Sequence, residues 1–211
     1  MIEKKRILVL APHTDDGEFG CGGSIAKFIE EGSHVYYVAF SIAEESVPDG
    51  FPKNILDLEV REATGILGIP SANLIVLRYS VRKFSYVRQE ILEDLVRIKK
   101  DIRPDLVILP SPHDLHQDHH TVAVEGMRAF KQVSMLGYEV PWNNMTFNNQ
   151  AFVKLKKSHL ELKIKALEAY KSQSGRSYAT ADFVRSLAVT RGIQIGTEYA
   201  EAFEVMRYVV E

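Results

Sequence analysis

Short continuous runs of apolar residues alternate along the chain with longer segments in which apolar positions recur every three to four residues. The first run, Arg6 to Ala11, has no polar position after Arg6 and ends at Pro12, so it predicts a strand buried on both faces. Similar runs predict strands at residues 34–42, 73–79, 105–110, 135–142 and 152–155, and an alternating pattern predicts a final strand at 202–210.

The segments between the strands have helical spacing. Leu56, Val60, Ala63 and Leu67, for example, share one face of a helix. Such spacing predicts helices at residues 23–32, 54–68, 86–102, 117–131, 158–172 and 181–190. This alternation predicts an α/β fold: a Rossmann-like, doubly wound, mostly parallel sheet flanked by helices, in a single domain over residues 1–211. In the common strand order 3-2-1-4, the first and fourth strands are neighbours, and ligands bind beyond their carboxyl ends.

Candidate metal-binding residues follow these two strands. His13, Asp15 and Asp16 come directly after the first strand, and the fourth is followed by SPHDLHQDHH, so that five of the seven histidines lie in two short segments. Catalytic zinc sites use three imidazole or carboxylate ligands and keep one position for water. His13, Asp16 and His119 would supply that set for one Zn²⁺ per chain. The ion would activate water as a nucleophile, and Asp15 would be the general base.

The second segment also offers a group for the opposite side of a reacting carbonyl. His116 is suited to stabilise an oxyanion or to protonate a leaving amine, and Asp118 could hold its tautomer or raise its pKa. This pairing requires a non-helical approach to His119, because residues two apart do not face each other on a helix. His113 and His120 are expected to be cap or surface residues.

Simpler interpretations exist for several of these residues. Asp15 and Asp16 could be acidic residues at a helix N-terminus, where the macrodipole favours them. Cys21 is expected to be a small buried apolar side chain, and Glu59, which lies in the apolar stripe of its helix, a satisfied structural carboxylate. None of these interpretations explains the two clusters together.

Composition narrows the possible partners and the compartment. The 211 residues carry a formal net charge of -2, which argues against general binding to nucleic acid or to anionic membranes. The single cysteine, Cys21, excludes an intrachain disulfide and favours a cytoplasmic location. No run of 18 or more apolar residues occurs, so no integral membrane segment is expected.

The two clusters together resemble a known family. APHTDD with the following GCGG, paired with HQDHH after the fourth strand, is similar to the His-Pro-Asp-Asp and His-x-Asp-His signatures of the PIG-L/LmbE family of zinc-dependent N-acetylglucosaminyl deacetylases. ALEAYKSQS and RGIQIGTEYAEAF extend the resemblance toward the C-terminus. It implies the same roles for the residues named above, and it suggests a homo-oligomer. Thr14 replaces the usual proline, and Ile55 and Leu56 stand where relatives often carry a basic residue.

The sequence therefore predicts a zinc hydrolase that deacetylates an N-acetylated amino sugar, such as a GlcNAc-type glycoside, nucleotide sugar or lipid-linked precursor. Glu139 and Trp142 are candidate sugar contacts. Alternatives are a zinc amidase with a substrate that is not a sugar, a nucleotide-binding module, and an inactive regulatory subunit. The glycines after the first strand do not have the G-x-G-x-x-G spacing of a dinucleotide site, and two aspartates there would repel a pyrophosphate.

Overall fold

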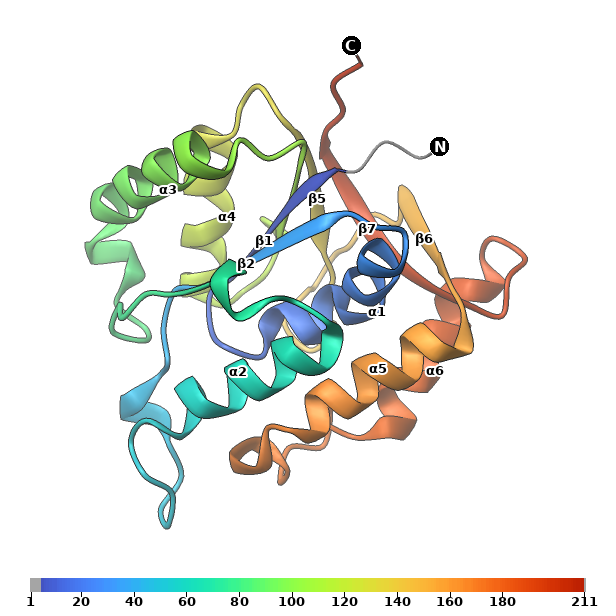
Figure 1. Ribbon diagram of the computed structural model, residues 1–211, viewed down its shortest axis with the longest axis horizontal. Coiled ribbons are helices and arrows are strands. Elements are labelled where there is room, and N and C mark those ends of the chain that lie inside the picture. The colour runs from blue at the N-terminus through green and yellow to red at the C-terminus, as the bar shows by residue number, and fades with distance from the viewer. Residues whose placement is uncertain (1–4, 211) are drawn as a thin grey trace.

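A seven-stranded sheet forms the centre of the molecule in the computed structural model, which describes residues 5–210 (Figure 1). The strand order is β3-β2-β1-β4-β5-β7-β6. The first five strands pair in parallel, and β7 is antiparallel to both of its neighbours. The strands are β1 (Arg6–Ala11), β2 (His34–Ala39), β3 (Leu74–Val76), β4 (Leu106–Pro110), β5 (Ser134–Tyr138), β6 (Ala151–Leu155) and β7 (Tyr199–Arg207).

Helices cover both faces of the sheet. α3 and α4 pack against each other on one face, while α1, α2 and α5 lie together on the other, with α6 beside α5 and β7 (Figure 1). The helices are α1 (Asp16–Glu30), α2 (Ile55–Leu67), α3 (Arg88–Ile102), α4 (Gln117–Ala129), α5 (Lys157–Glu168) and α6 (Ala181–Ile193). Among residues 5–210, no helix is long and apolar enough to cross a bilayer.

The unbroken apolar pattern of β1 follows from its central position. Ile7 and Val9 pack into the core beneath α1 and α2, whereas Leu8 and Leu10 pack into the core beneath α3 and α4. Both cores therefore require apolar residues from a single strand. The predicted α/β class and the strand order 3-2-1-4 are confirmed, and β1 has the predicted bounds.

α1 begins at Asp16, seven residues before the predicted helix, because the glycine-rich segment is itself helical. A side chain at Gly17 would place its Cβ 2.5 Å from the Tyr37 ring, and one at Gly20 would come within 2.3 Å of Tyr138. The glycines thus allow the first turns of α1 to lie close against the sheet. The helix is kinked at Cys21, whose φ of -150° is not helical.

Candidate active site

Two tyrosines, Tyr37 and Tyr170, hold the loop between β1 and α1 in place. The hydroxyls of Tyr37 and Tyr170 donate hydrogen bonds to the carbonyl oxygen of Thr14, at 2.8 and 2.7 Å. Both also contact the fully buried carboxyl of Glu18. Burial raises the pKa of Glu18 to about 8, although its bond to Tyr37 opposes this. At neutral pH a protonated Glu18 can donate a hydrogen bond in this network, so the loop has a rigid and uncharged support.

Three potential metal-ligand atoms, from His13, Asp16 and His119, lie close together at this loop. His13 Nδ1 lies 3.1 Å from Asp16 Oδ2, His119 Nε2 lies 3.1 Å from the same oxygen, and the two nitrogens are 3.3 Å apart. A tetrahedral zinc ion with bonds of about 2.0–2.1 Å separates its ligands by roughly 3.3–3.4 Å. The spacing of these atoms therefore suits a single small metal ion.

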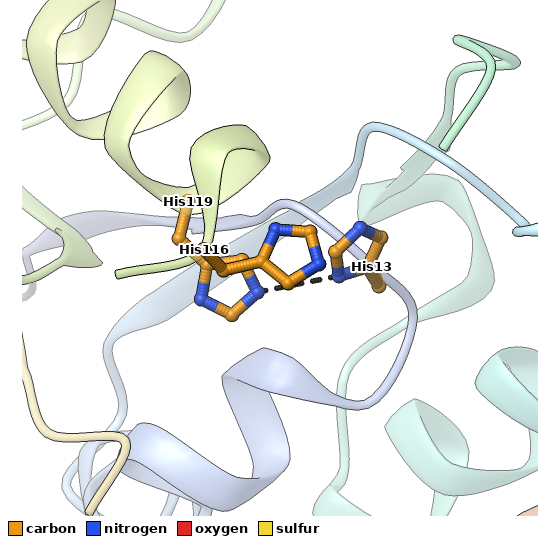
Figure 2. A group of neighbouring side chains, drawn as sticks. All are labelled: His13, His116 and His119. Atoms are coloured by element: carbon orange, nitrogen blue, oxygen red, sulfur yellow. Dashed lines mark hydrogen bonds between the residues drawn. The ribbon is translucent and has the colours of Figure 1, made fainter. Parts of the chain in front are cut away.

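A third histidine lies beside this triangle. The rings of His116 and His119 stack with centroids 4.7 Å apart, and those of His13, His116 and His119 form a compact group in Figure 2. Ligand atoms of these three imidazoles lie within 4.8 Å of one another, so the cluster could hold a metal ion. The predicted set and this cluster share His13 and His119, and differ in whether Asp16 or His116 is the third member.

Carboxylates behind the two shared histidines orient their rings. Asp118 Oδ2 lies 3.1 Å from His13 Nε2, and Asp114 Oδ2 lies 2.7 Å from His119 Nδ1. A proton on each of these outer nitrogens leaves an unshared electron pair on the nitrogen that faces Asp16, as a metal ligand requires. Asp118 is itself held by the backbone N–H groups of Arg82 and Phe84.

The carboxylate of Asp118 pairs with a different histidine from the predicted one, and although its charge acts to raise the pKa of His116, burial and the neighbouring imidazoles outweigh it. That carboxylate contacts His13, and only the backbone N–H of Asp118 reaches His116, by donating to Nδ1 at 3.2 Å. The cause is the local backbone: His116 is the N-cap of α4, in an extended conformation that lets its side chain accept this bond. Since Nδ1 accepts, the proton of the neutral imidazole is on Nε2.

Electrostatic interactions among the protein groups favour charge separation in the triangle residues. Burial opposes charging of His119, but Asp16 and Asp114 outweigh it and raise its pKa to about 10. For His13 too, Asp16 and Asp118 outweigh burial and raise the pKa. The two imidazoles in turn hold the pKa of Asp16 well below its usual range, in spite of burial. A cation is therefore favoured at the centre of this group.

The pKa values of the two candidate catalytic residues, Asp15 and His116, are shifted toward the neutral form of each side chain. Burial, together with the charge of Asp16, raises the pKa of Asp15 to about 6, although Arg176 and His13 act against this rise. Burial lowers the pKa of His116 to about 4, reinforced by the neighbouring imidazoles. At pH 7 Asp15 can accept a proton, and His116 is a neutral hydrogen-bond donor.

The site opens into a cavity of about 350 Å³. Trp142 and Tyr178 form one wall, with stacked rings 3.9 Å apart, and Phe19 packs edge-on against both. Trp142 is thus placed where it can contact a ligand. Glu139 is not among the residues that line this cavity, since its carboxylate pairs with Arg191 instead.

Several lining residues carried no recognisable signal in the sequence. Arg82, Arg176 and Tyr178 belong to irregular segments with no motif, whereas Gln173 lies in ALEAYKSQS, a segment that resembles the family but that suggested no role for this residue. Asp114 belongs to the histidine-rich segment and could have been found from its place between two histidines. His113 and His120 are exposed and Cys21 is buried, as predicted. Glu59 is a satisfied structural carboxylate, as predicted, because it accepts two hydrogen bonds from Ser172.

Comparison with known proteins identifies relatives of this chain. Residues 8–130 match the model of the PIG-L family, described as GlcNAc-PI de-N-acetylase. The chain is 30% identical over 178 residues to the uncharacterized deacetylase YaiS of Escherichia coli (strain K12), covering 81% of this chain and 92% of that protein. It is 25% identical over 222 residues to the diacetylchitobiose deacetylase of Thermococcus kodakarensis, covering 93% and 81% of the two chains.

Solved structures show the same architecture. The conserved protein TT1542 from Thermus thermophilus superposes with a TM-score of 0.82 at 25% sequence identity, over 98% of this chain and 97% of the other. The mixed sheet, its strand order and the covering helices are therefore those of an established fold.

Proposed function

The chain belongs to the PIG-L family, whose members are N-deacetylating hydrolases, and from this premise we propose that it is a zinc-dependent enzyme that removes the acetyl group from an N-acetylated amino sugar. The observation that supports this most directly is the triangle of His13, Asp16 and His119 donor atoms at the floor of a cavity that also contains Asp15.

We assign the metal to the triangle residues. His13 Nδ1, Asp16 Oδ2 and His119 Nε2 would hold one Zn²⁺ per chain, a donor set of two imidazoles and one carboxylate that suits zinc. A divalent ion there supplies Lewis acidity, which lowers the pKa of water from about 15.7 toward about 7 and polarises a carbonyl group. Asp114 and Asp118 keep the two imidazoles in the ligating tautomer.

Asp15 and His116 would handle the protons of the reaction. Asp15 accepts the proton of the attacking water, and the same proton then becomes available to the departing amine. Since His116 is neutral at pH 7 and its proton is on Nε2, it donates a hydrogen bond to the oxyanion formed from the acetyl carbonyl. The role proposed for His116 is therefore electrostatic, which is one of the two roles expected from the sequence.

The substrate class follows from the cavity and from one relative. The aromatic side chains of Trp142, Tyr178 and Phe19 line the cavity, and aromatic groups suit the apolar face of a sugar ring. The related Thermococcus enzyme is named for diacetylchitobiose, an N-acetylated amino sugar. We propose a GlcNAc-type sugar here; a zinc amidase with another amide substrate is the alternative. A nucleotide-binding role is disfavoured by the two carboxylates of Asp15 and Asp16 at the start of α1. A cytoplasmic location and a homo-oligomer remain predictions.

Free-amine release from a panel of N-acetylated sugars tests this proposal, with protein of measured metal content. We expect release that disappears on chelation and returns when zinc is restored. Asp15→Asn should keep its zinc and lose turnover, which separates chemistry from metal binding. Asp57→Asn is the matched control and should lose neither, since Asp57 pairs with Arg61 and Arg78 and does not line the cavity. Zinc-loaded protein that is inert on every sugar would refute the assignment.

A further inference from the structure

A buried hydrogen-bond chain ends at the cavity wall. Gln173 closes a short 3₁₀ helix (Lys171–Gln173) after α5, is only 5% exposed, and lines the cavity. Its Nε2 donates to Ser172 Oγ at 3.0 Å, and Ser172 Oγ donates to Glu59 Oε2 at 2.6 Å. Glu59 is 4% exposed and also accepts the backbone N–H of Ser172 at 2.9 Å. These hydrogen bonds therefore connect Glu59 of α2 to the cavity through Ser172 and Gln173.

The direction of each bond in this chain follows from the chemistry of its groups. A glutamate carboxylate only accepts hydrogen bonds, so the single hydroxyl proton of Ser172 is directed to Glu59. The Ser172 oxygen can then only accept from Gln173, and the group of Gln173 that faces it must be the NH₂. The amide orientation of Gln173 is thereby fixed, with Oε1 on the other side.

The amide oxygen of Gln173 is left as a free acceptor. Within residues 5–210, no hydrogen-bond donor reaches Oε1, and this oxygen is not among the fully enclosed atoms that lack a partner. The segment is also fixed relative to the reaction centre. The Gln173 backbone N–H bonds Tyr170 O at 2.9 Å, and the Tyr170 hydroxyl bonds Thr14 O, between His13 and Asp15. The wall thus presents a neutral acceptor at a set distance from the metal triangle.

We infer that Gln173 is a specificity-determining residue whose Oε1 accepts a hydrogen bond from one hydroxyl group of the sugar, with Glu59 and Ser172 as positioning residues. This inference rests on the proposed deacetylase function. The two carboxylates that line the cavity, Asp15 and Asp16, are assigned to proton transfer and metal binding. A neutral amide oxygen suits a neutral hydroxyl donor. A site built to pair a hydroxyl discriminates strongly against an analogue that lacks it, because the buried acceptor is then left unpaired.

The test combines sugar analogues with variants. We would measure kcat/KM for a GlcNAc glycoside and for its 3-, 4- and 6-deoxy analogues, using wild-type enzyme, Gln173→Leu and Gln89→Leu. Gln89 bonds Glu93 on the exposed side of α3 and serves as the matched control. In the wild type and the control, we expect removal of one particular hydroxyl to cost about tenfold in kcat/KM. In Gln173→Leu the parent glycoside should lose about tenfold and that deoxy analogue should be unaffected, so the discrimination disappears.

Glu59→Gln tests the positioning step and carries the experiment if Gln173→Leu does not fold. A glutamine at position 59 can donate to Ser172 Oγ, which frees the serine proton and allows the Gln173 amide to turn. We expect discrimination of the same hydroxyl to weaken to less than threefold while zinc content is unchanged. Equal discrimination in the variants and the wild type, or a wild type indifferent to every hydroxyl, would overturn the inference and leave the deacetylase intact. Failure of the wild type to release amine from any sugar would instead overturn the proposed function, and this inference with it.

Discussion

Replacement of Asp114 by asparagine should weaken zinc binding without a large change of shape. Both oxygens of Asp114 are used: Oδ1 accepts the backbone N–H of His116 at 2.8 Å, and Oδ2 faces His119 Nδ1 at 2.7 Å. The side chain is fully buried, so water cannot replace either partner. An asparagine has a single acceptor oxygen and can satisfy only one of these two groups.

Both orientations of the new amide have a cost. If the NH₂ group faces His119, the ring proton moves to Nε2, the atom that faces Asp16, and the electron pair needed for the metal is lost. If the oxygen faces His119, the NH₂ group opposes the His116 N–H, and the buried donor left unpaired costs about 1–3 kcal/mol of stability. Loss of a carboxylate behind a ligating histidine typically lowers metal affinity about 10–100-fold.

We therefore expect the zinc dissociation constant of Asp114→Asn to rise about 10–100-fold, measured by competition with a chromophoric chelator. Asp94→Asn is the matched control, because Asp94 bonds the Tyr79 hydroxyl and does not line the cavity. Its zinc affinity should equal that of the wild type. A wild-type dissociation constant in a folded Asp114→Asn protein would refute the argument that this carboxylate fixes the tautomer of His119.

Three further predictions follow from the same geometry. Asp15→Asn should retain one zinc per chain in elemental analysis and lose about 10²–10⁴-fold in kcat/KM, and retained turnover would exclude a base role. The pKa of about 10 for His119 in the metal-free site means that zinc must displace a proton, so the apparent zinc affinity in chelator competition should increase about tenfold per pH unit from pH 7 to 9; a flat profile would contradict this. Lys163→Met should cost about 3–5 kcal/mol in denaturant unfolding, because it leaves buried Glu201 without its 2.7 Å partner, and a Lys163→Met/Glu201→Gln double variant should recover part of the loss.

The sheet could be predicted from the sequence because its central strands carry a simple pattern. Ile7 and Leu8 point into different cores, so an unbroken apolar run is the necessary signature of β1. The start of α1 could not be predicted in the same way. Glycine disfavours helices, but Gly17 and Gly20 are required here, because the rings of Tyr37 and Tyr138 occupy the space that a side chain would need. Those contacts are long-range and leave no local signal.

The metal triangle was accessible to sequence analysis because its members lie at two strand ends that the fold places side by side. The partner of His13 was not, because the sequence does not show in which direction the carboxylate of Asp118 points. His116 lies just before α4 in an extended conformation, and Asp118 then turns away from it toward a histidine 105 positions earlier in the chain. Assigning such a pair requires the backbone geometry of both segments.

The cavity wall depends still more on packing than the metal site does. Gln173 and Tyr178 reach the cavity because the Tyr170 hydroxyl ties the end of α5 to Thr14, 156 positions away. The chemistry is thus specified by two short motifs, whereas the cavity wall is assembled from segments that lie far apart in the sequence. A relative can therefore keep His13, Asp15, Asp16 and His119 and still act on a different amide, because a change near Gln173 alters the wall without touching the metal ligands.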